Sequence, residues 1–251
     1  MEPKFLFAGD KAISIEFGTT IDPEINTQVI RLHKLMQEKP IDGVVELVPS
    51  YRSLNIVFCP EKIRYDILIE KCKSLLQELK QMQADSTSNI VRMVHLPILF
   101  GGEVGDELEV VADFHGITPQ ELINTVTSHP SRVYMIGFMP GLAYMSGNNG
   151  LHMPRHTTPR LDNGLKSHHT GGVFVLADNQ TNFMDFPSAT GWHPVGYTPV
   201  KQFLIGREDP FLFRPGDWCK FEAITQQQLE EIEAEMKAGT YQVNVSYEEV
   251  E

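Results

Sequence analysis

The chain has 251 residues, of which 22% are charged and 41% hydrophobic, a composition typical of a globular protein with one large or two modest domains. Its 33 acidic side chains outnumber 21 basic ones, and the resulting net charge of −12 argues against binding to nucleic acid. No run reaches the roughly 18 apolar residues of a membrane span, and the start lacks a basic and apolar secretion signal, so we expect a cytoplasmic protein without membrane contact.

The N-terminal part alternates predicted strands and helices. Apolar side chains at every second position predict a strand over 13–17, and Asp22 followed by Pro23 predicts the start of a helix. Two further strands and a second helix are predicted over 44–48, 54–58 and 63–82. The order strand, helix, strand, strand, helix indicates an α/β domain, which we bound at residues 1–89.

A second domain is predicted over 90–251. Residues 83–89 are small, polar and aperiodic, which favours a linker before it. A capping box at Thr118 predicts a short helix. The stretch 132–221 is rich in Gly, Pro and aromatic residues and favours a barrel or sandwich of short strands. A last helix is expected after Thr225, followed by a frayed acidic tail.

The most unusual local sequence is the loop 137–141, where two glycines flank a proline after an apolar strand. Glycine has no Cβ and proline fixes the turn, so backbone amides in this loop could approach a ligand closely. Phe138 and Tyr144 would wall such a pocket, with Pro140 and Gly141 in the loop itself. A tight turn packed on the core is the alternative, and it stays open.

Two Pro-Arg pairs lie in the extended segment 153–160. Arg155 and Arg160 could bind a carboxylate or phosphate through bidentate hydrogen bonds, because guanidinium geometry matches both anions. The alternative is a pair of arginines solvated on an exposed loop.

The histidines do not suggest a metal site. His152 and His156 have helical spacing, but Pro154 between them prevents a helix interior. His168 and His169 open a predicted strand, where adjacent side chains point to opposite faces, so at most one of them can join a given site. We therefore expect no bound metal and keep only His169 as a candidate.

Glycine-bearing turns supply the remaining candidates, Gly171, Gly172 and Trp192. The segment 101–105 contains three glycines but lacks the Lys and Ser/Thr that end a phosphate-binding loop, so a hairpin turn is expected there. The three cysteines are widely separated and form no CxxC pair, which favours reduced thiols; Cys219 is expected to be buried.

Recognisable motifs run in fixed order along almost the whole chain. In the N-terminal part they cover residues 9–18, 43–53 and 96–103. In the C-terminal part they are Gly137–Gly141, Pro154–Arg155, Pro159–Arg160, Gly191–Trp192, Gly196–Pro199 and Pro215–Asp217. In this order they resemble the B-type subunits of 5-oxoprolinase, a family also called KipI or allophanate hydrolase subunit 1. The resemblance implies an α+β chain with an N-terminal ferredoxin-like α/β domain and a cyclophilin-like β-barrel.

The same resemblance implies an activity and partners. Family members join a C-type subunit (KipA, allophanate hydrolase subunit 2) and a separate A-type subunit in an ATP-dependent 5-oxoprolinase that opens 5-oxo-L-proline to L-glutamate. ATP with Mg would then act at the level of the complex. The alternatives are a regulatory protein that inhibits a sensor histidine kinase, and one component of a related urea- or allophanate-processing amidohydrolase or carboxylase.

Departures from the family pattern fall on the presumed pocket. Val126 stands where the family usually has a histidine, and the turns at Gly171–Gly172, Trp192 and Tyr197 are altered. These changes indicate altered substrate specificity or lost catalysis, and they leave the catalytic residue unassigned.

Overall fold

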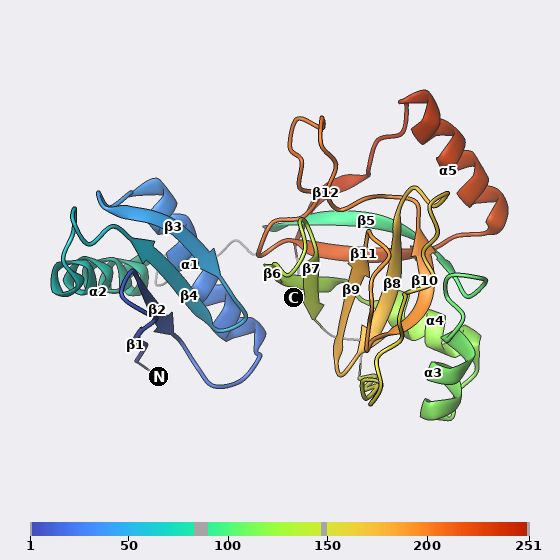
Figure 1. The fold of residues 1–251 in the computed structure, drawn as a ribbon, viewed down its shortest axis with the longest axis horizontal. Helices are drawn as coiled ribbons and strands as arrows, with labels where there is room; N and C mark the ends of the chain where they lie inside the picture. Colours follow the sequence, from blue (N-terminus) through green and yellow to red (C-terminus); the bar gives the residue numbers. More distant parts are fainter. Residues whose placement is uncertain (1, 83–89, 147–149, 250–251) are drawn as a thin grey trace. The chain divides into compact units, whose positions relative to one another are not determined.

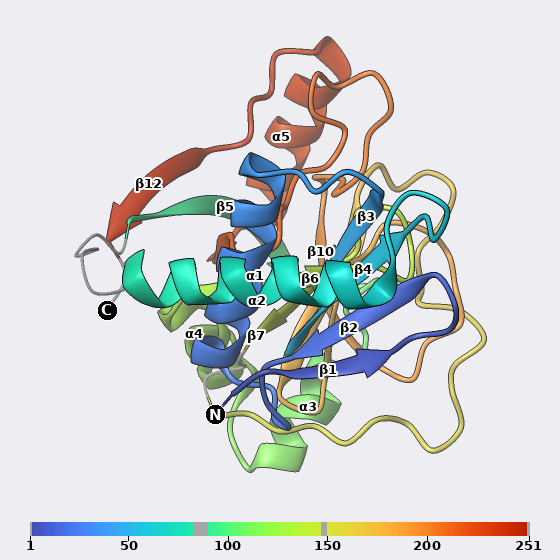
Figure 2. The same cartoon turned by 90° about the vertical axis from the view of Figure 1, so that its left-hand side faces the viewer.

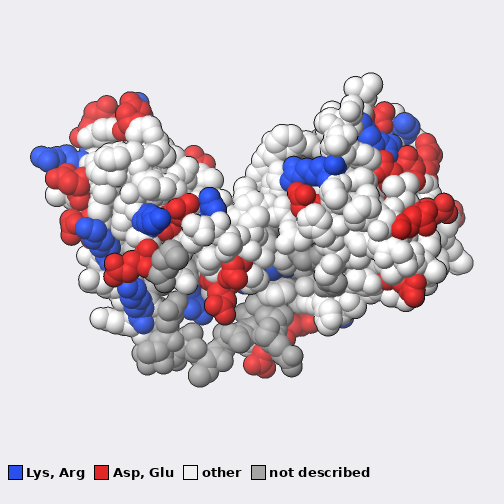
Figure 3. All heavy atoms as spheres, turned by 90° about the horizontal axis from the view of Figure 1, so that it is seen from below, with Lys and Arg blue, Asp and Glu red and all other residues white. Residues whose placement is uncertain are grey.

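The structure is a computed structural model that describes residues 2–82, 90–146 and 150–249. The chain divides into two compact units, Met1–Asn89 and Ile90–Val250, and is mixed α+β (Figure 1). The predicted linker 83–89 lies outside the described residues. Among the described helices, none combines the length and the apolar character that crossing a bilayer demands. On the face drawn in Figure 3, acidic and basic side chains occur side by side on both units.

The N-terminal unit is a sheet covered by two helices on one face. Its antiparallel sheet has the order β1 (Lys4–Phe7), β2 (Ala12–Glu16), β4 (Ser53–Phe58) and β3 (Val44–Pro49). The helices are α1 (Pro23–Glu38) and α2 (Tyr65–Met82), and Figure 2 shows them crossing one another. Alternate apolar residues of β2 and β4 pack with both helices in one core, which makes a two-layer domain.

The predicted start of the first helix is confirmed, and one strand was missed. The Asp22 side chain accepts hydrogen bonds from the backbone N–H groups of Glu24 and Ile25, with Pro23 at the first helical position. A ferredoxin-like sheet would take a strand after the second helix. Here β1, from the start of the chain, occupies the place beside β2. Because most of its side chains are exposed, β1 has no apolar alternation to reveal it.

The C-terminal unit is a closed β-barrel, which confirms the predicted barrel. The strands follow the order β10 (His193–Thr198), β8 (Gly172–Ala177), β9 (Gln180–Met184), β7 (Ala143–Ser146), β6 (Ser131–Ile136), β11 (Trp218–Ala223) and β5 (Ile90–Phe100). The barrel closes where Gly196 and Tyr197 of β10 pair with Phe100 and Leu99 of β5. Phe174, Phe183 and Phe221 fill the interior with ring centroids 5.0 to 5.8 Å apart.

Three helices accompany the barrel: α3 (Leu108–His115), α4 (Pro119–Ser128) and α5 (Gln226–Ala238). The capping boxes at Thr118 and Thr225 are both formed, as predicted. The expected hairpin at 101–105 is wrong, because this segment leads from β5 into α3 instead of returning along β5. Helix α3 buries Val111 and Ala112 against the barrel core, so packing at this position favours a helix.

The expectation of a frayed tail is also wrong for residues 245–249. They form strand β12 (Val245–Glu249), which pairs antiparallel with Ile90–Val94 of β5. Ser246 Oγ and Glu248 Oε1 lie 2.9 and 3.2 Å from His95 Nε2, so side chains support the backbone pairing. The acidic residues at 245–249 are ordered because they pair with the edge of β5, a contact that the sequence pattern does not reveal.

Candidate functional site

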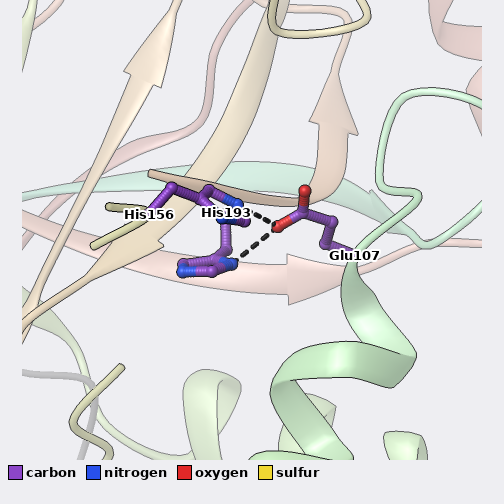
Figure 4. A group of neighbouring side chains, drawn as sticks. All are labelled: Glu107, His156 and His193. Atoms are coloured by element: carbon purple, nitrogen blue, oxygen red, sulfur yellow. Dashed lines mark hydrogen bonds and ion pairs between the residues drawn. The ribbon is translucent and has the colours of Figure 1, made fainter. Parts of the chain in front are cut away.

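Five charged or ionisable side chains meet where α3 and β10 begin: Asp106, Glu107, His156, Arg160 and His193. We call them the carboxylate–histidine cluster. Glu107 lies at its centre: one carboxylate oxygen, Oε2, is 2.6 Å from His193 Nδ1 and 2.8 Å from His156 Nε2. Figure 4 shows both histidines directed at this oxygen, and their rings lie with centroids 4.0 Å apart at an interplanar angle of 36°. The second oxygen, Oε1, accepts a hydrogen bond of 2.8 Å from Arg160 Nη1.

Backbone pairing brings these distant positions together. The extended segment 153–160 runs beside the turn that precedes β10: His156 N donates to Gly191 O at 2.9 Å, and Arg160 exchanges two hydrogen bonds with Thr190. Glu107 N donates to Pro194 O at 3.0 Å, which fixes the start of α3 against β10. The cluster is therefore built on regular backbone contacts, which hold a site more firmly than a free loop does.

Arg160 orients the acidic side of the cluster. Its guanidinium binds Asp106 in bidentate fashion at 2.8 and 3.1 Å while it also binds Glu107. The hydrogen bonds to Asp106 are the main reason why the pKa of Arg160 is raised, so the group stays charged. The exposure of the side chains increases from His193 (4%) through Glu107 (13%) to His156 (28%).

Tyr144, Arg155 and Trp192 form a second group, in which Arg155 and Trp192 directly precede His156 and His193 in the sequence. The Arg155 guanidinium carbon is 5.1 Å from the centroid of the Trp192 ring, a cation–π contact, and Tyr144 meets the same indole edge-on at 6.3 Å. Partial burial raises the pKa of the Tyr144 phenol, although Arg155 opposes this shift. We call these three residues the aromatic shelf.

Both predicted arginines are bound to carboxylates of this same chain. Arg160 is held by Asp106 and Glu107, and Arg155 Nε donates to Asp178 Oδ2 at 2.8 Å. Neither is simply solvated on a loop, which was the alternative. Arg155 remains about half-exposed, so it is the one of the two that a ligand can reach.

The loop 137–141 has the features of a tight turn. Gly141 has φ +77°, and a Cβ there would lie 2.8 Å from the Phe203 Cβ and 3.1 Å from Gln202 C and Phe203 N, so the missing side chain allows the segment 202–203 to approach closely. Phe138 also has positive φ, at 69°, and is 79% exposed, while Pro140 is exposed as well. Phe138 therefore does not enclose a cavity together with Tyr144 in this chain.

Gly171 and Gly172 serve barrel packing. A Cβ on Gly171 would lie 1.8 Å from Thr198 O, and one on Gly172 would lie 2.6 Å from Asp185 Oδ1. Gly171 N also donates to the Tyr197 hydroxyl at 3.1 Å. Close approach to Thr198 of β10 explains Gly171, and close approach to Met184 of β9 and to Asp185 explains Gly172.

His168 and His169 lie before β8 and not on it, so the reasoning from alternating strand faces was wrong. Their rings are 4.2 Å apart, and His169 also contacts the Tyr197 ring at 5.1 Å. Burial, followed by the repulsion from His168, lowers the pKa of His169.

Two further positions belong to the core. Val126 is 3% exposed and belongs to the barrel core cluster, so its side chain packs within that core. Cys219 is fully buried as predicted, and burial raises the pKa of its thiol.

The sequence reasoning missed Asp106, Glu107 and His193. His156 was weighed only with His152, which is exposed and does not join the cluster. The available signal was weak: two acidic residues stand directly before an apolar pattern at 108, 111 and 112 that matches a helix. Nothing in the spacing of positions 107, 156 and 193 indicates that they meet.

Comparisons with known proteins identify the family of this chain. Residues 3–213 match the family described as carboxyltransferase domain, subdomain C and D. The chain is similar to the 5-oxoprolinase B-type subunit of Bacillus subtilis, with 29% identity covering 87% of this chain and 92% of the relative. It is also similar to the 5-oxoprolinase B-type subunit of Haemophilus influenzae, with 34% identity covering 71% of this chain and 78% of the relative.

Among solved structures, the crystal structure of TTHA0988 matches with a TM-score of 0.72 and 26% identity over 86% of this chain. This chain spans only 40% of the length of that protein.

Proposed function

The chain belongs to the family of 5-oxoprolinase B-type subunits, and we propose that it is one subunit of an ATP-dependent complex that opens 5-oxo-L-proline to L-glutamate. Its residues 3–213 match the carboxyltransferase domain of subdomains C and D. The observation that carries the proposal is the match to B-type subunits of similar length: the B. subtilis relative is covered over 92% of its residues. Because these relatives are named as one lettered subunit of an enzyme, further subunits are expected, and we propose homologues of the A-type and C-type subunits as the partners.

The chemistry explains why such a protein would not act alone. The nitrogen of a lactam donates electron density into its carbonyl, so hydrolysis needs activation, and ATP can supply it through a phosphorylated intermediate. Stabilising the charge that develops on a transferred phosphoryl group requires cations or Mg²⁺. In this chain Arg160 is already held by two carboxylates, so we assign ATP and Mg²⁺ to the complex as a whole.

We assign substrate contact within this chain to the aromatic shelf. Arg155 is about half-exposed and uses its Nε–H for Asp178, while a guanidinium has five N–H donors. The remaining donors suit the carboxylate of 5-oxoproline, and the Trp192 indole and Tyr144 ring offer apolar surface for its ring methylenes. The candidates Phe138, Pro140, Gly141, His169, Gly171 and Gly172 are given scaffold roles in this proposal.

Reconstitution tests the activity. The chain is combined with the A-type and C-type homologues of its own genome, complex formation is verified, and ADP and glutamate are measured with and without 5-oxoproline. Both products should depend on 5-oxoproline and on the presence of this chain. A verified three-part complex that forms neither product would refute the proposal.

A matched pair of variants tests the shelf. Arg155→Met should raise KM for 5-oxoproline by roughly 10-fold or more, because a charged hydrogen bond contributes about 1.5–3 kcal/mol. Lys201→Met is the control, since Lys201 also lies over an aromatic ring, that of Phe186 at 5.8 Å, but outside the shelf. Equal KM values for the two variants would remove Arg155 from substrate binding.

A further inference from the structure

Both ring nitrogens of His193 face oxygen acceptors. Nε2 lies 2.9 Å from the carbonyl oxygen of Pro154, and Nδ1 lies 2.6 Å from Glu107 Oε2. A neutral imidazole has one N–H, so it can donate to only one of these oxygens. With the proton on Nε2 and directed at Pro154, the Nδ1 lone pair faces Glu107 Oε2, and a cation between these two atoms would bind both.

The surrounding contacts match those of a metal site. Carbonyl oxygens commonly hold the non-coordinating N–H of a metal-bound histidine, which fixes the tautomer, and Pro154 does this for His193. Arg160 holds the other oxygen of Glu107 in the same supporting role. One ligand atom from each of Glu107, His156 and His193 lies within 4.8 Å of the others. We propose that these three residues bind a divalent transition metal, and that the metal is Zn²⁺.

The ligand types select the metal. Two imidazole nitrogens and one carboxylate oxygen form a His₂Glu set, which zinc takes with a fourth position left for water or a ligand. Calcium and magnesium prefer all-oxygen sites and disfavour two imidazoles. The charges agree: Asp106 and Glu107 together outweigh Arg160, so with neutral histidines the cluster carries one negative charge.

Coordination requires the contacts of Glu107 Oε2 to lengthen and the two imidazole nitrogens, which lie within 4.8 Å of each other, to take the same spacing. Zinc bonds of about 2.0–2.1 Å in tetrahedral geometry place ligand atoms roughly 3.3 Å apart, so the contacts of Glu107 Oε2 would each widen by about 0.5–0.7 Å. His156 can provide this shift, because its side chain is 28% exposed and belongs to an extended segment. The same exposure gives an ion its entry path from solvent.

Binding is measured on the isolated chain, so the result does not depend on the proposed lactam-opening activity. Untagged protein is freed of metal with a chelator and titrated with Co²⁺, followed by visible absorption, and with Zn²⁺, followed by calorimetry. One equivalent should bind, with the intense absorption of low-coordinate Co²⁺, and Zn²⁺ should displace the cobalt. Bound Zn²⁺ should also raise the melting temperature of the protein.

Substitutions locate the site. His156→Gln and His193→Gln should each weaken Zn²⁺ binding by about 100-fold or more, beyond the 10–100-fold cost of losing a supporting contact. The control is His152→Gln, because His152 is exposed, directly precedes the segment 153–160 and is outside the cluster. This variant should bind like the wild type. His156→Gln is the decisive variant, since its partial exposure limits the cost to folding.

Two results would overturn the proposal. The first is wild-type protein that binds no Zn²⁺ at equimolar concentration, which would leave a proton between His193 and Glu107. The second is full binding by a correctly folded His156→Gln variant, which would place the metal on other histidines.

Discussion

Loss of Arg160 should destabilise the barrel more than loss of the exposed Arg214 does. Arg160→Met keeps the aliphatic stem but removes three hydrogen bonds to carboxylates, two to Asp106 and one to Glu107. Breaking a fully buried ion pair costs about 3–5 kcal/mol. Because the side chain of Arg160 is 25% exposed and that of Asp106 46% exposed, water reduces this cost, and we expect about 2 kcal/mol.

The assay can follow the barrel alone. Both tryptophans, Trp192 and Trp218, belong to the C-terminal unit, so tryptophan fluorescence reports its unfolding separately from the N-terminal unit. A loss of about 2 kcal/mol should lower the melting temperature of a unit of this size by about 4–8 °C. Arg214→Met is the matched control, because Arg214 binds Asp209 with side chains 64% and 45% exposed. It should change the free energy of unfolding by less than about 1 kcal/mol.

The reasoning would be refuted by equal melting temperatures of the two variants. Equality would mean that solvent screens the cluster as completely as it screens an exposed pair. In that case the claim that Arg160 preorganises Glu107 could not be maintained.

Two further variants test packing and ionisation. Gly171→Ala should destabilise the barrel by about 1–3 kcal/mol or more, because its Cβ would lie 1.8 Å from Thr198 O, whereas Gly137→Ala meets only Met135 Cε at 3.5 Å and should melt near the wild type. Burial raises the pKa of Asp185 in the native state above its usual 3.8. Between the pKa of the unfolded state and that of the native state, the native state therefore binds more protons. The free energy of unfolding consequently falls as the pH rises through this range. Asp185→Asn removes this term, so its free energy of unfolding in urea should improve relative to wild type as the pH rises above the usual carboxyl pKa of 3.8. A difference that stays constant with pH would contradict the raised pKa.

Local signals in the sequence predicted the elements that local chemistry determines. The caps at Asp22, Thr118 and Thr225 mark helix starts because their side chains bind backbone N–H groups within three residues. Strands β1 and β12 were missed because each is an edge strand whose order depends on a distant partner. The hydrophobic pattern within one segment does not show whether a strand elsewhere in the chain has an unpaired edge.

The cluster escaped prediction for the same reason. Glu107 meets His156 and His193 only because 153–160 pairs with the turn before β10, a contact between parts of the chain that are far apart in sequence. Gly171 was predicted as a site residue because it lies on a glycine-bearing turn, but its missing Cβ accommodates Thr198 O. A glycine that approaches backbone and one that approaches a ligand look alike in sequence, so only the structure distinguishes them.

Alternation along two extended segments divides the site into surfaces of opposite charge. Arg155 contacts Trp192, and the next residue of each segment, His156 and His193, contact each other. Successive side chains in extended backbone point to opposite sides, so one side presents a cation on an aromatic ring and the other presents histidines around Glu107. An anionic substrate is attracted to the first surface and a metal cation to the second. If both proposals hold, Arg155→Met should weaken substrate binding while Zn²⁺ affinity stays unchanged, and His156→Gln should lose Zn²⁺. Variants that always lost both together would show one shared site instead of two surfaces.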